Sequence, residues 1–319
     1  MSLKTLLLLL NWVSKIRCEG NFEFEDISKQ AGVDADGWSN GVNMVDINND
    51  GWLDIYVCRG GTLKKEAQRS NLLFINNKDN TFTEQAKAYN IADDGYSINA
   101  AFLDYDLDGD LDLYVTNYPT IFKAKLGEIK VMSKNPPDEF RDKFYRNNGD
   151  GSFNEVAREI GIVRNAGHGL GLAITDINND GYPDIYVSND YITDDYCYVN
   201  NQNGTFREEV QKHFKHSANF SMGVDAADIN NDGYSDLIAL DMTPEDNYRS
   251  KTTMAAMNPD KFWHRIKNEG GHPQLMRNVL QLNNGNSIYS EIGQMAGVHS
   301  TDWSWAPLMM DFDNDGLRD

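Results

Sequence analysis

The sequence predicts an all-β protein, a β-propeller of four-stranded antiparallel blades, and three observations support this fold class. A nine-residue motif, DxDxDGxxD or DxNxDGxxD, occurs five times, and successive copies start 52 to 83 residues apart. A run of β-branched and aromatic residues follows each of the first four copies, which indicates a strand. Two more apolar runs around an Asn/Gly/Asp turn then indicate a hairpin. Repeats of this length with four short strands are typical of propeller blades.

The first strand of each repeat lies directly before the motif. We expect these strands at residues 38–45, 96–103, 168–175, 220–227 and 303–310. Each begins with a residue that carries a ring, namely Trp38, Tyr96, His168, Phe220 and Trp303. Small residues recur inside the strand, namely Gly41, Asn99, Gly171, Gly223 and Ala306. Small residues allow close approach of a neighbouring backbone, so this strand is predicted to be the innermost one, near a central axis.

The second strand follows the motif, and the third and fourth strands form the hairpin. We expect the hairpins at 71–86, 143–157, 196–210 and 279–293. Insertions near 118–141 and 241–277 separate the second from the third strand in two repeats. The longer insertion contains a predicted helix from Asn247 to Lys267.

The two ends of the chain differ from the repeats. Residues 1–20 contain a lysine and a short apolar run, and we interpret them as a leader or a degenerate signal segment. Residues 21–33 have the pattern of a fourth strand with no third strand before it. The chain ends at Asp319, the last position of the fifth motif. We therefore expect residues 21–319 to form a partial propeller that is incomplete at the C-terminus.

The motif has the composition of a loop that binds a hard cation, and we number its copies loops 1 to 5 in chain order. Calcium takes six to eight oxygen ligands in irregular geometry, whereas magnesium requires a stricter octahedron and thiophilic metals prefer Cys or His. The loops offer Asp and Asn oxygens at positions 1, 3, 5 and 9, so they predict about five calcium sites. The predicted ligands are Asp46, Asn48, Asp50 and Asp54 in loop 1, Asp104, Asp106, Asp108 and Asp112 in loop 2, Asp176, Asn178, Asp180 and Asp184 in loop 3, Asp228, Asn230, Asp232 and Asp236 in loop 4, and Asp311, Asp313, Asp315 and Asp319 in loop 5.

An EF-hand is the main alternative for these loops, and it requires a bidentate Glu at position 12 and flanking helices. Position 12 is instead Val57, Val115, Val187 or Ala239, and a strand pattern follows the loop. The Asp at position 9 is therefore predicted to supply the last carboxylate. The Gly at position 6 is expected to allow a sharp turn that a side chain would obstruct.

Composition and charge restrict the function. The net charge of −20 disfavours binding to nucleic acid, and five calcium ions would halve it. Three cysteines, Cys18, Cys58 and Cys197, form neither a disulfide framework nor a metal-binding spacing. The pair His213 and His216 is predicted to lie at the surface. No apolar run is long enough for a transmembrane helix.

The DxDxDGxxD loops with FxE hairpins resemble the FG-GAP/VCBS repeats of integrin alpha-subunit propellers. Residues 216–249 and 280–316 are more closely similar to the ASPIC/UnbV-type proteins related to cartilage acidic protein. The resemblance covers residues 21–319. It implies a calcium-binding propeller of about seven blades, exported or attached to the surface, with calcium ligands at the loop positions given above. The expected location is extracellular, or the bacterial cell surface or periplasm.

A calcium-rigidified adhesion or recognition module is the function that we expect, and we expect no enzymatic activity. A hydrolase or lyase built on a propeller is an alternative, although the six histidines show no HExxH motif. A purely structural assembly subunit is a second alternative.

The expected partner is a protein or glycan ligand, bound on the face opposite the calcium loops. In an antiparallel meander the calcium loops share one end of the sheet with the hairpin turns, and both insertions lie at the other end. Long loops on a rigid scaffold often carry binding residues. Trp263, Tyr248 and Trp305 are the first candidates for contact with this partner.

Overall fold

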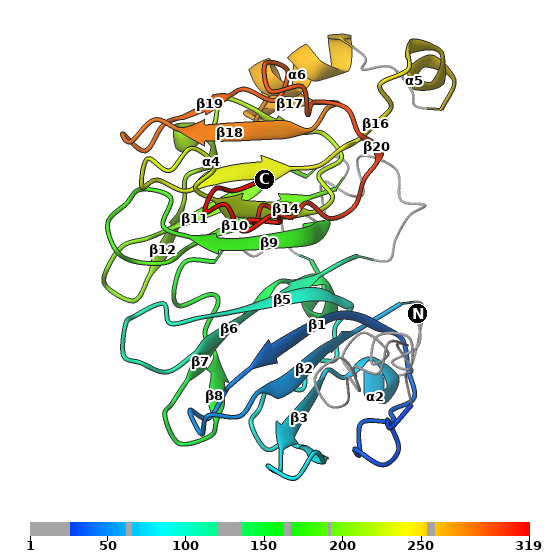
Figure 1. Cartoon of the computed structure of the whole chain (residues 1–319), viewed down its shortest axis with the longest axis vertical. Helices are drawn as coiled ribbons and strands as arrows, with labels where there is room; N and C mark the ends of the chain where they lie inside the picture. The colour runs from blue at the N-terminus through cyan, green and yellow to red at the C-terminus, as the bar shows by residue number, and fades with distance from the viewer. Residues whose placement is uncertain (1–25, 62–65, 120–135, 163–166, 191–192, 254–258) are drawn as a thin grey trace. The chain divides into compact units, whose positions relative to one another are not determined.

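Four antiparallel sheets of four strands each form most of the computed structural model, which describes residues 26–61, 66–119, 136–162, 167–190, 193–253 and 259–319. In every sheet the strands lie side by side in sequence order (Figure 1). The predicted all-β class and the four-stranded repeat are therefore confirmed. The chain divides into two compact units. Unit 1 comprises Met1–Asp104, Asp108–Ala157 and Arg164–Ala166, and unit 2 comprises Tyr105–Leu107, Arg158–Val163 and Gly167–Asp319.

Each unit contains two of these sheets. Unit 1 contains β1 (Ser39–Val45), β2 (Asp54–Arg59), β3 (Leu72–Asn76) and β4 (Phe82–Glu84), followed by β5 (Ser97–Leu103), β6 (Asp112–Asn117), β7 (Lys143–Asn147) and β8 (Phe153–Glu155). Unit 2 contains β9 (Gly169–Thr175), β10 (Asp184–Asn189), β11 (Tyr196–Asn200) and β12 (Phe206–Glu208), followed by β14 (Val224–Ala227), β15 (Asp236–Ala239), β18 (Val279–Asn283) and β19 (Tyr289–Glu291). These strands confirm the predicted second strands and hairpins.

The second strand of each sheet runs through the core. Every residue of β2, β6 and β10 is buried, and each strand has an apolar centre between a buried Asp at its start and a buried polar residue at its end. Their aromatic side chains, Tyr56, Tyr114 and Tyr186, are fully buried. Tyr56 packs in the core of unit 1, and Tyr186 packs in the core of unit 2. Burial of these residues provides much of the hydrophobic stabilisation.

The first strands of neighbouring sheets pack together within each unit, β1 on β5 and β9 on β14. A Cβ atom at Gly41 would lie 2.7 Å from the carbonyl oxygen of Ile98, and one at Gly171 would lie 2.8 Å from the backbone nitrogen of Val224. Both distances are too short for any side chain. Gly41 and Gly171 are therefore required by the close approach of the next sheet.

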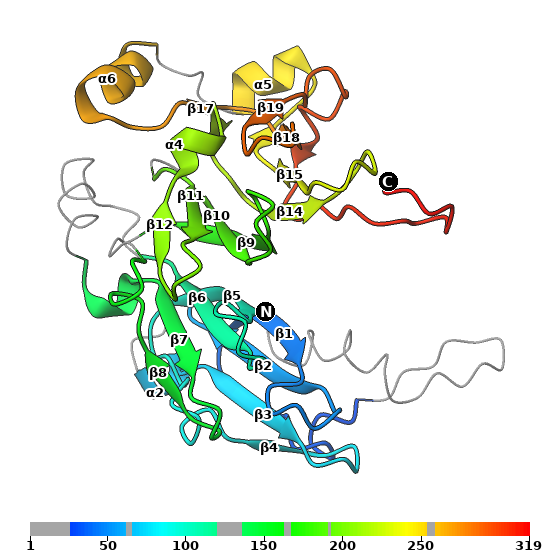
Figure 2. The same cartoon turned by 90° about the vertical axis from the view of Figure 1, so that its left-hand side faces the viewer.

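Shorter elements lie outside the four sheets. They are α2 (Glu66–Arg69), η2 (Asp138–Phe140), α4 (Val210–His213), β13 (Ser217–Ala218), β16 (Met242–Thr243), α5 (Asn247–Thr253), α6 (Pro259–Glu269), β17 (Gln274–Leu275) and β20 (Asp302–Trp303). β13 pairs with β17 in parallel, and β16 pairs with β20 in antiparallel orientation. In both views α5 and α6 lie outside the sheets of unit 2 (Figure 2). No described helix is both long and apolar enough to cross a membrane.

Two predicted first strands are wrong over much of their length. Only Val224–Ala227 of the predicted strand 220–227 is regular, because the N–H groups of Asn219 and Phe220 donate to the carboxylate of Asp241. Only Trp303 of the predicted strand 303–310 lies in a strand. Residues 304–310 pair with no strand of the described part of the chain, and the N–H of Met309 donates to the Asp225 carboxylate instead.

Two other predictions need correction. Residues 26–33 of the predicted strand segment 21–33 form a turn, since the N–H of Ala31 donates to the carbonyl of Ile27 and that of Val33 donates to the carbonyl of Ser28, and residues 21–25 lie outside the described residues. The helix predicted from Asn247 to Lys267 is two helices, and the second begins at Pro259, a residue that suits the first turn of a helix but not its interior. The leader, most of the insertion near 118–141, and residues 254–258 lie outside the described residues.

Candidate calcium sites

Loops 1 to 5 share one backbone conformation. The residue at position 4 has a positive φ of 54° to 61°, and the Gly at position 6 has a φ of 86° to 93°. A Cβ atom at any of the five glycines would find nothing within 4 Å. The glycine is therefore required by its left-handed conformation, as the predicted sharp turn implies, and not by contact with neighbouring residues. Leu107 takes the left-handed position in loop 2, where the other loops have Asn.

The Asp at position 1 organises each loop through its carboxylate. In loop 3, the two oxygens of Asp176 accept hydrogen bonds from the N–H groups of Asp180 at 2.9 Å and Gly181 at 2.7 Å. The same two bonds occur in the other four loops. Position 5 accepts a bond from the N–H of position 7. These bonds turn the carboxylates at positions 1 and 5 into the loop.

The carboxylates converge on one another. In loops 2 and 5, which have Asp at position 3, one oxygen from each of positions 1, 3 and 5 lies within 4.8 Å of the others. These residues are Asp104, Asp106 and Asp108 in loop 2, and Asp311, Asp313 and Asp315 in loop 5. A set of carboxylate oxygens without nitrogen or sulfur suits a hard cation, so the residues present fit calcium.

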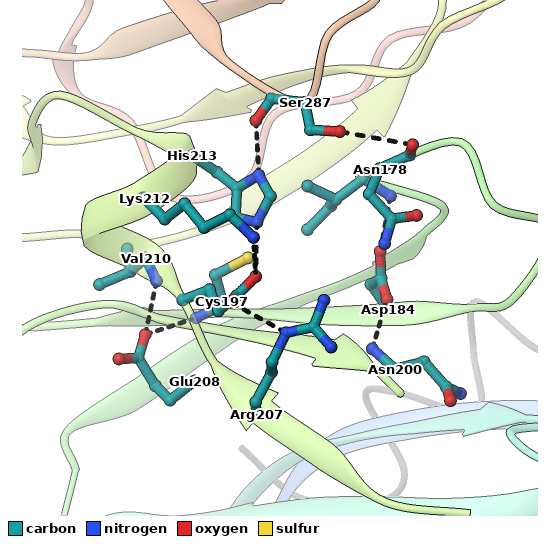
Figure 3. A network of polar contacts seen from close by, with 12 residues as sticks. Asn178, Asp184, Cys197, Asn200, Arg207, Glu208, Val210, Lys212, His213 and Ser287 are labelled. Carbon is teal, nitrogen blue, oxygen red and sulfur yellow. Dashed lines mark hydrogen bonds and ion pairs between the residues drawn. The ribbon is translucent and has the colours of Figure 1, made fainter. Parts of the chain in front are cut away.

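The Asp at position 9 joins the loop to the sheet. The carboxylate of Asp184 accepts hydrogen bonds from the N–H of Ile177 at 2.9 Å and from that of Asn200, at the end of β11, at 2.7 Å (Figure 3). Asp54 and Asp236 make the same pair of bonds in loops 1 and 4. Position 9 therefore fixes the loop to the neighbouring strand, in addition to its predicted role as a ligand.

Burial and the charges of neighbouring acids raise the pKa of the Asp at position 9 in loops 1, 3 and 4. Burial, together with the charges of Asp180 and Asp176, raises the pKa of Asp184 from 3.8 to about 7, although two backbone hydrogen bonds oppose the shift. Burial likewise raises the pKa of Asp54 and of Asp236, again with a contribution from the acids at positions 5 and 1. Repulsion among the acids of one loop would be relieved by a bound cation.

Sequence reasoning missed the asparagine that ends the third strand of each sheet. These residues are Asn76, Asn147, Asn200 and Asn283. Each donates its N–H to the position 9 carboxylate and its side-chain amide to the carbonyl of position 8. Its side-chain oxygen accepts the N–H two residues later in the hairpin turn. Two consecutive asparagines open every hairpin turn in the sequence, and the first of them is this residue. The pair was interpreted only as a turn signal, so the contact of the first Asn with the loop was not predicted.

The hairpin turn therefore lies at the same end of the sheet as the calcium loop, as predicted. In the first sheet, the ammonium of Lys78 in the turn lies 3.3 Å from the carboxylate of Asp50. In unit 2 a further contact links neighbouring sheets. Ser287, in the turn between β18 and β19, donates its hydroxyl to the carbonyl of Asn178 in loop 3, and its own carbonyl lies 2.5 Å from Nδ1 of His213 (Figure 3).

His213 is buried, so its predicted surface position is wrong. Cys58 and Cys197 are free and buried, while Cys18 lies outside the described residues.

His168 is buried with Nδ1 2.9 Å from the Thr193 hydroxyl. Tyr96 packs against Phe140, and the Arg69 guanidinium lies 4.4 Å from its ring centroid. The ring positions of the first strand therefore include packing residues.

We expect substitution of Asn200 by Ala to destabilise the third sheet by about 1–3 kcal/mol, because it removes the hydrogen bonds of the Asn200 side chain to the Tyr105 carbonyl, the Pro183 carbonyl and the hairpin N–H of Gln202. Asn201, the next residue, provides the matched control, because the hydrogen bonds of its side chain stay within the hairpin, to Thr205 in the turn and Arg207 of β12. Chemical denaturation of both variants at saturating calcium measures the difference. Equal destabilisation by the two substitutions would show that Asn200 does not join loop 3 to the hairpin.

Comparison with known proteins identifies the repeat. Residues 65–115, 137–187 and 176–239 match the family model of the FG-GAP-like repeat. This chain contains FG-GAP-like repeats. Every matched stretch includes a motif loop or the strands beside it, so the repeat detected from sequence coincides with the sheets described above. No curated protein is detectably similar to the chain.

Three solved structures illustrate the level of structural similarity. An Agrocybe aegerita lectin that recognises non-reducing terminal N-acetylglucosamine has 15% identity and a TM-score of 0.42, and the match covers 87% of this chain and 58% of the lectin chain. The exotype rhamnogalacturonan lyase YesX has 13% identity and a TM-score of 0.35, with 64% and 39% covered. The V. cholerae biofilm matrix protein Bap1 has 14% identity and a TM-score of 0.35, with 66% and 36% covered. The chain thus spans between about a third and three fifths of these proteins.

Proposed function

We propose that this chain is a calcium-stabilised β-propeller module that recognises a protein or glycan ligand and has no catalytic activity. The observation that carries the proposal is the fivefold repetition of one loop geometry, with acids at positions 1, 5 and 9 and Asp or Asn at position 3. In this proposal, as in the ASPIC/UnbV and integrin-type proteins that the sequence resembles, the module acts outside the cell or on the bacterial cell surface or in the periplasm.

Calcium would be held by the residues at positions 1, 3, 5 and 9 of each loop. A bound divalent cation supplies positive charge among three or four carboxylates that otherwise repel one another. The protein contributes the orientation of these groups. Position 1 binds the loop backbone, position 9 binds the loop and the third strand, and the asparagine at the end of that strand binds the hairpin turn. Metal binding would therefore stiffen one end of each sheet.

The opposite end of the sheets carries the insertion of unit 2, and we place the ligand there. This insertion, between β15 and β18, contains α5 and α6. Tyr248 on α5 is 75% exposed, and Trp263 on α6 is 52% exposed. Trp305, outside the insertion, is 61% exposed. Exposed aromatic side chains on a rigid scaffold are frequent anchors for ligands.

Replacement of residues 247–269 by a short Gly/Ser linker tests this location. The replacement removes α5 and α6 but keeps β16 and β17, which pair with other segments of unit 2. We expect wild-type protein to bind a subset of a glycan and protein microarray, and the variant to lose that binding while its calcium stoichiometry is unchanged. Retention of the same array profile by the variant would place the ligand elsewhere. Turnover of an array ligand by wild-type protein would favour a hydrolase or lyase.

A further inference from the structure

The hairpin between β18 and β19 contacts two of the candidate calcium loops, loop 4 of its own sheet and loop 3 of the sheet before it. Both loops belong to unit 2. The backbone N–H of Asn283, at the end of β18, donates to the Asp236 carboxylate of loop 4 at 2.7 Å. The side-chain amide of Asn283 donates to the carbonyl of Ser235 in loop 4 at 3.3 Å and to that of Ile177 in loop 3 at 3.4 Å. This asparagine therefore joins the two loops.

The hydroxyl of Tyr289, the first residue of β19, joins the same two loops. It lies 3.1 Å from the Ser235 carbonyl and 3.3 Å from the Ile177 carbonyl, and it accepts a hydrogen bond of 3.0 Å from the Asn283 amide. Two amide hydrogens and one hydroxyl hydrogen are therefore shared between two backbone carbonyls. Asn283 and Tyr289 are buried, so bulk water does not compete for these hydrogen bonds.

The two carbonyls lie next to predicted calcium ligands. Ile177 stands between the ligands at positions 1 and 3 of loop 3, and its own N–H donates to the Asp184 carboxylate at 2.9 Å. Ser235 directly precedes Asp236, the position 9 ligand of loop 4. Burial raises the pKa of Tyr289, and the charges of Asp236 and Asp184 contribute to the rise. A cation in either loop would therefore change the electrostatic environment of the same hydroxyl.

A tyrosine at this place is specific to the fourth sheet. The asparagine that ends the third strand pairs with the first residue of the fourth strand in every sheet, and this residue is Phe82, Phe153 or Phe206 in the other three. The position therefore accepts a phenylalanine, and packing does not require the hydroxyl of Tyr289. The hydroxyl contributes the hydrogen bonds to the two loops instead.

We propose that Tyr289 and Asn283 couple the calcium sites of loops 3 and 4, so that occupation of one raises the calcium affinity of the other. This inference rests on the calcium binding proposed above. Calcium in loop 3 draws the ligands at positions 1 and 3 together and thereby fixes the Ile177 carbonyl between them. The fixed carbonyl orients Tyr289 and Asn283, which hold positions 8 and 9 of loop 4, so the second ion has less of its loop to order. The coupling is reciprocal, because the two binding free energies are linked.

Hydrogen exchange of the full-length protein, followed by mass spectrometry during a calcium titration, tests the coupling because it resolves the loops. The calcium concentration for half-maximal protection of residues 228–236 reports loop 4, and that of residues 46–54 reports loop 1. Asp180→Ala removes a ligand from loop 3 and should raise the loop 4 midpoint about threefold to tenfold, the effect of one or two hydrogen bonds, with loop 1 unchanged. In a chain that also carries Tyr289→Phe, Asp180→Ala should raise the loop 4 midpoint by less than about twofold.

Tyr234→Phe is the matched control, because it removes a hydroxyl from loop 4 that makes no hydrogen bond among the described residues. Asp180→Ala should still shift the loop 4 midpoint by its full factor in this chain. Equal loop 4 midpoints with and without Asp180→Ala, or the full shift in the chain that carries Tyr289→Phe, would overturn the coupling while calcium binding stands. Absence of calcium-dependent protection in every loop would instead refute the calcium binding on which the coupling rests.

Discussion

Chelation of calcium by EDTA is expected to lower the melting temperature of this protein by about 5–10 °C or more. The free energy of unfolding rises by RT ln(1 + [Ca]/Kd) for each site that only the folded state binds, about 2.7 kcal/mol for a Kd near 10 μM in ~1 mM calcium. Each unit holds at least one complete loop, and about 1 kcal/mol shifts the melting temperature of a unit of this size by ~2–4 °C. The loss should be large because the convergent carboxylates of every loop then repel one another.

Differential scanning fluorimetry with and without EDTA measures this effect. Calcium added in excess should restore the melting temperature, and zinc should not, because the loops offer no nitrogen or sulfur ligand. An unchanged melting temperature in EDTA, or recovery with zinc alone, would refute the role of calcium in stability.

The second large effect concerns two buried acids at the other end of the sheets. Asp142 and Asp195 occupy equivalent places before the third strand. Each accepts a backbone N–H from the end of the second strand, at Asn117 or Asn189, and a tyrosine hydroxyl. Burial raises the pKa of both carboxyls from 3.8 to about 7 despite these hydrogen bonds. The folded state therefore binds their protons more tightly than the unfolded state does.

Stability should fall as the pH rises from about 4 to about 7, since the buried acids lose their protons only at a free-energy cost in the folded protein. Replacement of Asp142 or Asp195 by Asn should remove this cost, so each variant should be more stable than wild type by about 2 kcal/mol or more at pH 8, and by much less at pH 5. Urea denaturation at saturating calcium at both pH values measures the difference.

The chain contains its own control for this prediction. Asn71 and Asn278 occupy the same place in the first and fourth sheets, and each accepts the equivalent backbone N–H. Replacement of either by Asp should introduce the same loss of stability as the pH rises. The variant should therefore be less stable than wild type, mainly above pH 7. A pH-independent effect of all four substitutions would show that the acids at these places do not titrate with folding.

Much of the fold follows from local sequence. The loop motif, the strand that follows it and the hairpin with its Asn/Gly turn depend on residues close together in the chain, and β1, β5 and β9 begin within one residue of their predicted starts. The small residues Gly41 and Gly171 also revealed the close approach of neighbouring first strands. The predicted ligands of loops 2 and 5 converge for the same reason, because positions 1, 3 and 5 lie in one short loop.

Features that depend on distant residues could not be predicted. Asn200 meets Asp184 only after β10 and β11 pair, and the buried His213 meets the carbonyl of Ser287, which is 74 residues away in the chain. Residues 304–310 have a strand sequence but no ladder partner among the described residues, so pattern alone overestimated that strand. The helix predicted from Asn247 to Lys267 was too long because its starting signal was recognised and Pro259, at which α6 begins, was not taken into account.

The stoichiometry of calcium binding is the most direct test of the account. Titration calorimetry on the calcium-free protein should give about five sites per chain. The same titration of Asp180→Ala should give one site fewer, because Asp180 contributes only to loop 3 and repeat units bind independently to a first approximation. Absence of calcium binding, or loss of every site in the Asp180→Ala variant, would contradict the assignment of the five loops as separate calcium sites.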